Sequence, residues 1–400
     1  MLEKIKSIKK TVYRFFTLKV IFPYWYKLCA NKKIKEDKVI FVEMRLPEIS
    51  NSFQIIYQQL KMNYLFKVKE CYLRNGFVSR YEYFLRCLLM IKEIATAKYI
   101  FVNEASNVIS TCPIRRETKV IQLWHGCGAF KKFGFSTADL IFGDDRKNQI
   151  RYPSYKNYDL VTVSSPEVIW AYAEAMQLEQ NKEIIKPLGI SRTDIFFDDN
   201  ILQQARKKLY QLIPAAKNKK VVLYAPTFRG RVADAQAPDK LDYNLMKEKL
   251  DEEYILLVKH HPLVKKRPEI PGNCAKFVFD ITEQMTIEDA MCVADICISD
   301  YSSLIFEYSL LERPMLFFAY DIEEYIDWRG FYYPYEEFTP GPVVNTTEEI
   351  VRYLLHTELF DLEKARLFKE KFMISCDGHS TERILQEVFG EELKRYKKNS

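Results

Sequence analysis

The sequence lacks the signatures of several large enzyme classes. It has no GxGxxG fingerprint, no Walker P-loop and no GxSxG elbow. These absences argue against dinucleotide binding, P-loop nucleotide hydrolysis and serine hydrolase chemistry. It also has no HExxH motif and no Asp-x-Asp pair of the kind that holds a divalent cation, and no clustered carboxylates accompany the adjacent histidines His260 and His261. We therefore expect neither a metal nor a cofactor.

Cysteine pairs and long apolar runs are missing too. The nine cysteines include no CxxC pair, which predicts reduced, mostly buried thiols in a cytosolic protein, with Cys292 and Cys297 in a core. The N-terminal segment has no apolar run near 18 residues and no clean apolar region before a small-residue cleavage site. We therefore expect neither a membrane span nor a signal peptide there.

Positive charge is concentrated at the N-terminus. Residues 1–38 hold eleven Lys or Arg against three acids, a local excess of +8, so the other 362 residues sum to about −2. Apolar residues at helical spacing lie between these lysines, at Ile5, Ile8, Val12, Phe15 and Phe16. The pattern favours a helix on an anionic membrane surface, although an ordinary helix packed on its own domain fits as well. A nucleic-acid arm is a third reading, but no recognition fold accompanies it, and we expect no nucleic acid partner.

Strand-like and helical segments alternate along the rest of the chain. Strands are expected at 38–46, 65–73, 98–104, 118–123 and 160–165. The pattern restarts after residue 200 with strands, some running into loops, at 219–228, 254–262, 276–282, 296–303 and 313–321. Such alternation predicts an α/β fold with two doubly wound Rossmann-like domains facing a cleft. We expect a basic arm at 1–37, domains at 38–190 and 191–375, and a C-terminal helix within 376–400 that packs back on the first domain.

Unusual polar residues follow four of the predicted strands. They occur in WHG (124–126), APTFRG (225–230), KHHP (259–262) and SDYSS (299–303). In open α/β sheets, ligands bind at the carboxyl ends of the strands. Of the adjacent histidines, one should point into the sheet layer and one toward the cleft, and such a pair chelates one metal poorly. The serine pair before a helix predicts an anion site, although a plain helix cap explains it equally well.

The combination suits metal-free transfer between phosphorylated molecules. Histidine can accept a proton near neutral pH, and serines, Arg229 and lysines can hold phosphate. Whether His125 acts in chemistry or only fills a core stays open at this point.

Taken in order, these motifs resemble the CDP-glycerol glycerophosphotransferases of teichoic acid and capsule synthesis. The resemblance spans roughly residues 100–390 and rests on QLWHGCGAFKKFG, LGISRTD, YAPTFRG, VKHHP, SDYSSLIFEYSLLERPMLFFAYDIEEY, RGFYYPYEEFTPGPVVNTTEEI and CDGHSTERI. It implies two Rossmann-like domains in the GT-B arrangement. It also implies transfer of glycerol phosphate or ribitol phosphate from a CDP-polyol to a hydroxyl, with release of CMP and no metal in the transfer step.

The resemblance assigns roles to individual residues. His125 matches the base that activates the acceptor, and His261 the histidine that contacts the donor's diphosphate. The other residues implied in substrate or phosphate binding are Gly126, Thr227, Arg229, Lys259, Asp300, Ser302, Ser303 and Glu307, the last on the donor's ribose. The implied acceptor is an undecaprenyl-linked saccharide or a growing polyol-phosphate chain. The implied location is peripheral, at the cytoplasmic face of the cell membrane.

The sequence departs from the family pattern at three places. The usual W-H-G-T-P reads W-H-G-C-G through Cys127 and Gly128, Lys259 replaces an arginine, and Phe228 replaces a tryptophan. Two other readings stay open: a GT-B glycosyltransferase that uses a nucleotide sugar, and a catalytically degenerate member that binds polymer or partners. The polyol, the acceptor, the number of units added and the oligomeric state are not fixed by the sequence.

Overall fold

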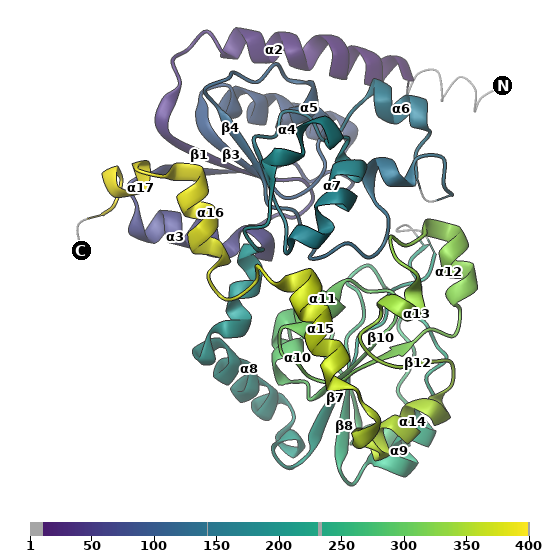
Figure 1. Ribbon diagram of the computed structural model, residues 1–400. Helices are drawn as coiled ribbons and strands as arrows, with labels where there is room; N and C mark the ends of the chain where they lie inside the picture. The colour runs from purple at the N-terminus through teal and green to yellow at the C-terminus, as the bar shows by residue number, and fades with distance from the viewer. Residues whose placement is uncertain (1–10, 142, 231–233, 399–400) are drawn as a thin grey trace, which may run out of the picture. The chain divides into compact units, whose positions relative to one another are not determined.

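The computed structural model describes residues 11–141, 143–230 and 234–398, and it divides into two compact units (Figure 1). Unit 1 combines the chain up to Gly126 with Lys132–Asp194 and the chain from Ser375 onward. Unit 2 combines Cys127–Lys131 with Ile195–Ile374. A five-residue segment of the first half of the chain therefore belongs to the second unit.

Unit 1 is built on a six-stranded parallel sheet with strand order β2-β1-β3-β4-β5-β6. The strands are β1 Lys35–Glu43, β2 Lys67–Tyr72, β3 Ala97–Val102, β4 Lys119–Gln122, β5 Leu160–Thr162 and β6 Ile185–Lys186. Its helices are α2 Phe22–Cys29, α3 Asn51–Asn63, α4 Arg80–Ile94, α5 Asn107–Thr111, α6 Arg146–Arg151, α7 Ile169–Met176, α16 Ser380–Phe389 and α17 Glu392–Arg395.

Both faces of this sheet are buried. Successive side chains of a strand point to opposite faces, so the continuous apolar run of β1 covers both. Val39 and Phe41 lie in one core cluster with residues of α3 and α16, and the alternate residues Ile40 and Val42 are fully buried outside that cluster. This burial explains why a β-rich apolar run between two helices forms a central parallel strand.

Unit 2 repeats the architecture with strand order β12-β11-β10-β7-β8-β9, again all parallel. The strands are β7 Lys220–Tyr224, β8 Tyr254–Val258, β9 Val278–Asp280, β10 Ile296–Ser299, β11 Met315–Phe318 and β12 Val343–Val344. Its helices are α8 Asp199–Leu212, α9 Tyr243–Leu250, α10 Ile287–Val293, α11 Leu304–Ser309, α12 Ile322–Arg329, α13 Tyr335–Phe338, α14 Thr347–Leu355 and α15 Leu362–Met373. The predicted α/β fold with two parallel-sheet, Rossmann-like domains is confirmed.

The described part of the basic N-terminal segment is one continuous helical stretch. Residues 11–16 are helical, Thr17–Ile21 (η1) form a π-helical turn, and α2 follows directly. The Thr17 hydroxyl donates to the Tyr13 carbonyl at 2.7 Å, a side-chain bond within the turn that accompanies the local widening. Ile5 and Ile8, which were part of the predicted helical pattern, lie outside the described residues.

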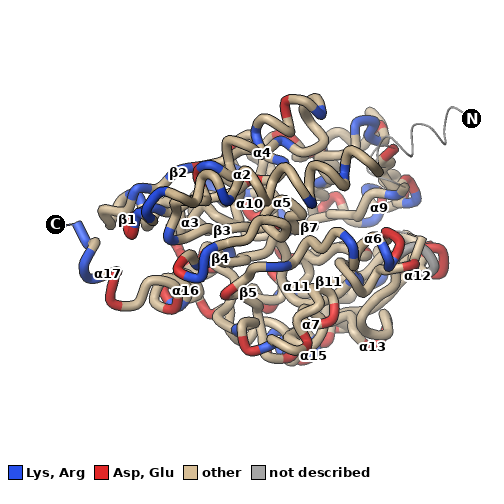
Figure 2. Tube along the Cα trace, turned by 90° about the horizontal axis from the view of Figure 1, so that it is seen from above, with Lys and Arg blue, Asp and Glu red and all other residues tan. Residues whose placement is uncertain are grey.

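One face of this helix is fixed to unit 1. Leu18, Phe22 and Tyr26 are buried, and Trp25 Nε1 donates to the Leu88 carbonyl at 2.9 Å. The opposite side leaves many large apolar side chains exposed: Val12, Tyr13, Phe15, Phe16, Val20, Ile21, Tyr24 and Leu28. The charged residues along the helix, visible in Figure 2, are all cations between residues 11 and 33.

The C-terminal helical pattern is interrupted where the sequence carries a glycine. Gly390 has φ +53°, in the left-handed region, and separates α16 from α17. Phe389 nevertheless stays in the core of unit 1, with its ring 4.4 Å from that of Tyr99. The single C-terminal helix expected within 376–400 is therefore two helices, because glycine tolerates a backbone conformation that ends a helix.

All nine cysteines are free thiols, seven of them buried, and Cys292 and Cys297 lie in the core as predicted. Within the described ranges, no helix is long and apolar enough to cross a membrane.

Candidate active site

Polar residues collect at the carboxyl ends of the strands in both units. In unit 1, Glu43 ends β1, Asn103 follows β3 and His125 lies three residues beyond β4. In unit 2, Thr227, His261 and Asp300 follow β7, β8 and β10. Each unit therefore carries predicted site residues at the sheet edge where open α/β folds bind ligands.

His125 is presented by a strained backbone. The preceding residue, Trp124, has φ +57°, a left-handed conformation that a bulky residue rarely adopts. Its amide donates to Gln122 Oε1 at 2.9 Å, and its buried ring lies 4.9 Å from that of Phe133. His125 itself is exposed. Backbone strain of this kind persists where the surroundings impose it and is concentrated at functional sites.

The contact of His125 with Asn103 fixes its neutral tautomer. His125 Nδ1 lies 3.0 Å from the carbonyl oxygen of Asn103. A carbonyl oxygen only accepts, so Nδ1 carries the hydrogen and Nε2 is left with the lone pair. Nε2 is therefore the atom that can take a proton from a substrate.

A buried carboxylate supports this arrangement from the end of β1. Glu43 Oε1 accepts from the Ser50 amide at 2.7 Å, and Glu43 Oε2 accepts from Asn103 Nδ2 at 3.3 Å. Asn103 Nδ2 also donates to the Ser50 hydroxyl at 2.8 Å. Burial raises the pKa of Glu43, and the bonds from Ser50 and Asn103 oppose this effect. The network holds the segment whose carbonyl orients His125.

His261 has the opposite tautomer. The Leu263 amide donates to His261 Nδ1 at 3.2 Å, so the hydrogen of the neutral ring is on Nε2, which can donate to a substrate oxygen. One side of the residue is exposed, but the protein around its other side and the charge of Lys131 lower its pKa. His260 is 3% exposed and its amide donates to Thr282, as expected for the histidine that points into the sheet layer.

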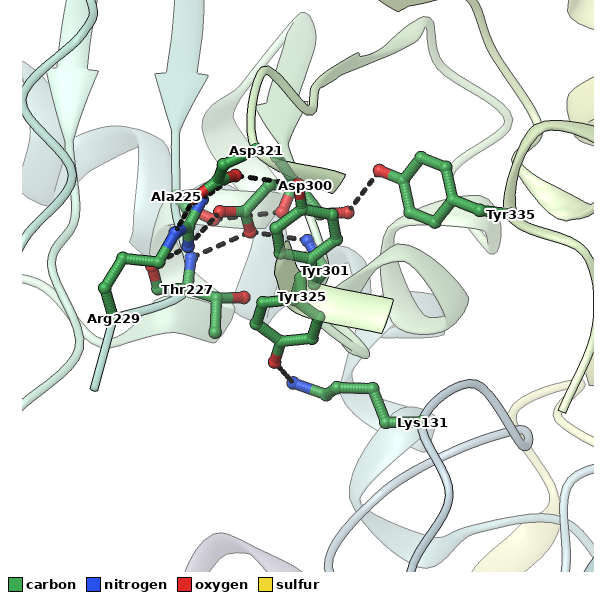
Figure 3. Close-up of polar contacts among 10 residues, drawn as sticks. Lys131, Ala225, Thr227, Arg229, Asp300, Tyr301, Asp321, Tyr325 and Tyr335 are labelled. Atoms are coloured by element: carbon green, nitrogen blue, oxygen red, sulfur yellow. Dashed lines mark hydrogen bonds and ion pairs between the residues drawn. The ribbon is translucent and has the colours of Figure 1, made fainter. Parts of the chain in front are cut away.

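Arg229 is held by two carboxylates (Figure 3). Its Nη1 donates to Asp300 Oδ2 at 2.8 Å and to the Thr227 carbonyl at 2.6 Å. Its Nε and Nη2 donate to the two oxygens of Asp321 at 2.5 and 2.9 Å. Burial lowers the pKa of Arg229, but Asp300 and Asp321 outweigh it, and the pKa is raised. The guanidinium is thus engaged with protein groups that fix the loops after β7, β10 and β11.

Asp300 is the buried centre of this cluster. It is 1% exposed, and its Oδ1 accepts from the amides of Thr227 and Tyr301 at 2.8 and 2.6 Å. The carboxylate is shielded from solvent, and its hydrogen bonds fix the backbone positions of Thr227 and Tyr301.

Tyrosines extend the cluster toward the segment Cys127–Lys131. The Tyr301 hydroxyl donates to Asp321 at 2.8 Å, and the Tyr301 ring stacks on that of Tyr325 with centroids 4.0 Å apart. Lys131 Nζ donates to the Tyr325 hydroxyl at 3.3 Å (Figure 3). A lysine from the first half of the chain therefore contacts a tyrosine that stacks on the Arg229 cluster of unit 2.

The remaining predicted residues occupy varied positions. Ser302 and Ser303 are half-buried before α11, and the Ser302 hydroxyl accepts from the Leu304 amide at 3.3 Å. Glu307 is buried on α11. Lys259 Nζ donates to the carbonyls of Thr282 and Met285, both at 2.6 Å.

Sequence reasoning brought together Thr227, Arg229 and Asp300, which contact one another, but it did not find their partner Asp321 or the positioning residues Asn103 and Glu43. Asp321 stood in a quoted motif without a role. Asn103 and Glu43 carried a signal, since each follows or ends an apolar strand. Among the described residues, no group of three or more His, Cys, Asp or Glu is arranged to hold a metal ion.

Comparisons with known proteins show the family of this chain. The family model described as CDP-glycerol:poly(glycerophosphate) glycerophosphotransferase matches residues 24–390. The teichoic acid ribitol-phosphate primase of Bacillus spizizenii is 34% identical over 373 residues, covering 92% of this chain and 95% of the relative. The teichoic acid glycerol-phosphate primase of Bacillus subtilis is 27% identical over 392 residues, covering 96% and 98%.

A solved structure shares the fold. A variant of the wall teichoic acid polymerase TagF superposes with a TM-score of 0.77 at 20% identity, covering 98% of this chain and 97% of that one. This likeness shows the fold alone.

Proposed function

Because this chain belongs to the CDP-glycerol:poly(glycerophosphate) glycerophosphotransferase family, we propose that it transfers a polyol phosphate from a CDP-polyol to an acceptor hydroxyl and releases CMP. The observation that carries the proposal is the match to a teichoic acid primase over nearly the full length of both chains. The reaction belongs to teichoic acid or capsule synthesis.

We propose ribitol phosphate as the transferred group. The ribitol-phosphate primase of Bacillus spizizenii is 34% identical to this chain, and the glycerol-phosphate primase of Bacillus subtilis is 27% identical. Both relatives are covered almost completely, so the difference does not arise from unequal coverage.

His125 is the proposed general base. Its Nδ1 hydrogen is directed to the Asn103 carbonyl, and its Nε2 lone pair is the acceptor for the proton of the attacking hydroxyl. The hydroxyl oxygen forms a bond to the phosphorus that carries the polyol, and the bond from that phosphorus to the CMP oxygen breaks. The proton ends on His125 Nε2, and the extra negative charge ends on CMP.

His261 is the proposed donor to that leaving group. Its Nε2 hydrogen can bond a diphosphate oxygen, and a nearby phosphate would raise the low pKa of the ring and favour its charged form. Ser302, Ser303 and the Thr227 hydroxyl are proposed phosphate contacts, and Glu307 the ribose contact. The space around Gly126, next to the base, is open. A Cβ atom built there would contact only the Trp124 side chain, with Nε1 at 3.8 Å.

Three other predicted residues are proposed to act through the loops that they hold. Arg229 and Asp300 fix the loops that carry Thr227 and Tyr301, and Lys259 ties the end of β8 to the loop at Thr282. The proposal assigns the base to unit 1 and the phosphate contacts to unit 2. No step in it calls on a metal ion.

We also propose that the N-terminal helix attaches the enzyme to the membrane that carries a lipid-linked acceptor. The exposed apolar side chains of residues 12–28 lie with cations on a helix whose other face is fixed to unit 1. Neighbouring α4, which packs against α2, adds exposed Tyr81, Leu85 and Leu89. Full burial of a large apolar side chain contributes about 1.5–3 kcal/mol, and each cation near an anionic surface about 1 kcal/mol.

The test is release of CMP from CDP-ribitol and, in parallel, from CDP-glycerol, with a lipid-linked saccharide acceptor and EDTA present. The proposal expects acceptor-dependent CMP release, faster with CDP-ribitol. Release of UMP from a UDP-sugar by the same preparation, without CMP release from either CDP-polyol, would contradict it.

A further inference from the structure

The segment Cys127–Lys131 is built into unit 2. The Tyr332 amide donates to the Phe130 carbonyl at 2.9 Å, and Lys131 forms an antiparallel bridge with Phe331. The Phe130 ring lies 4.9 Å from that of Phe331 and 5.0 Å from that of Phe338. These backbone and ring contacts fix the position from which the Lys131 side chain departs.

The Lys131 side chain points toward the hydroxyl of Tyr325 (Figure 3). Its Nζ is 3.3 Å from the Tyr325 hydroxyl and 5.8 Å from the centre of that ring. Tyr325 stacks on Tyr301, and Tyr301 immediately precedes Ser302 and Ser303. The ammonium group therefore contacts an aromatic stack whose second ring belongs to the residue just before the serine pair.

The charge of Lys131 also reaches His261. After burial, it is the next cause of the lowered pKa of that ring. The positive charge of Lys131 disfavours the protonated form of His261, and an anion that bound both groups would offset this effect.

We propose that Lys131 is a diphosphate ligand of the CDP-polyol donor. Its ammonium group binds the phosphate oxygens and offsets the negative charge that develops on CMP as the bond between the two phosphorus groups breaks. The inference rests on the proposed function, since it requires a cytidine diphosphate donor. Lys131 lies six residues after the proposed base His125 and would act on the leaving CMP.

The test separates phosphate recognition from general damage by using nucleotides without an acceptor. The full chain and its Lys131→Met, Lys131→Arg and Lys132→Met variants are titrated with CDP and with cytidine by calorimetry. Lys131→Met should weaken CDP binding about 10- to 100-fold and leave cytidine binding unchanged, because only CDP carries the phosphates. Lys131→Arg should retain most of the affinity, and Lys132→Met should change it by less than about twofold.

Each other result counts against the inference. Equal losses for CDP and cytidine, an unchanged affinity of Lys131→Met for CDP, or the same loss in Lys132→Met would overturn it. If Lys131→Met melts early, Lys131→Gln at low temperature replaces it, with cytidine binding as the test of folding. A wild-type chain that binds neither nucleotide would instead overturn the proposed function, so the two failures are distinguishable.

Discussion

A Cβ atom at Gly128 would lie 2.1 Å from Cε1 of Phe306, and Gly128 has φ +60°. Only glycine fits this position, because any other residue would meet the ring and would also adopt a left-handed backbone. Proline, which the family usually carries here, has φ fixed near −65°. The conformation seen at Gly128 is therefore one that a proline could not adopt.

Gly128→Ala should lower the free energy of unfolding by about 2–4 kcal/mol, because overpacking and left-handed strain add. Urea unfolding measures the change. Gly272→Ala is the matched control, since a Cβ there meets nothing within 4 Å. Phe306→Leu in the Gly128→Ala background should recover part of the loss, and full additivity of the two substitutions would contradict the clash.

His125→Gln should reduce CMP release about 10²- to 10⁴-fold while CDP binding stays close to that of the wild type, because the general base is lost and the donor site is not. Turnover and calorimetry measure the two quantities. Glu43→Gln should have a smaller effect on CMP release, since Glu43 acts through Asn103. We expect it to shift the pH dependence of kcat and to leave KM nearly unchanged. Full turnover of folded His125→Gln would eliminate the base assignment.

Arg229→Lys should destabilise the chain by about 3–5 kcal/mol despite keeping the charge, because a lysine cannot bridge Asp300 and Asp321 and leaves a buried carboxylate underpaired. Loss of stability in denaturant should accompany any loss of CDP affinity. A variant of wild-type stability with impaired CDP binding would instead identify Arg229 as a direct phosphate ligand.

The combined variant Phe16→Glu and Tyr24→Glu should bind anionic vesicles at least about tenfold more weakly than the wild type, because two apolar contacts are replaced by repelled charges. Vesicle cosedimentation measures the binding. Leu355→Glu and Leu367→Glu, at exposed leucines of unit 2, form the control. Equal losses in both pairs would argue against attachment through the N-terminal helix.

The stability of unit 1 should depend on pH through Glu93. Burial raises its pKa, but hydrogen bonds from Lys38 and Lys69 outweigh burial and lower it to about 2. Because the folded-state pKa is depressed, the stabilisation is present above the unfolded value of 4.5 and is lost as the pH falls toward 2. The contribution is about 1–2 kcal/mol after allowance for partial exposure. Lys38→Met should flatten the stability profile between these pH values.

The sequence alone predicted the fold well, because local patterns determine it. Long apolar strands between helices, such as 38–46 and 254–262, predicted central parallel strands, and the structure places β1 and β8 there. The two-residue strands β6 and β12 were missed because they are too short to show a period.

The site was predictable only in part. The strand-end motifs brought out His125, His261 and Asp300, because each is an unusual residue after an apolar run. The pairing of Arg229 with Asp321 joins residues 92 positions apart, and the contact of Lys131 with Tyr325 joins residues 194 apart. Such pairs depend on the order of the strands and the path of the loops, which no local pattern contains.

The segment Cys127–Lys131 makes unit 2 structurally incomplete as a continuous piece of chain. Residues 195–374 expressed alone would lack the strand partner of Phe331 and the ring that packs on Phe338. The isolated unit should therefore be able to bind the missing segment as a separate peptide, as in fragment complementation. A synthetic peptide of residues 124–134 is expected to bind the isolated unit and raise its melting temperature, and the same peptide with Phe130→Ala is expected to do so less.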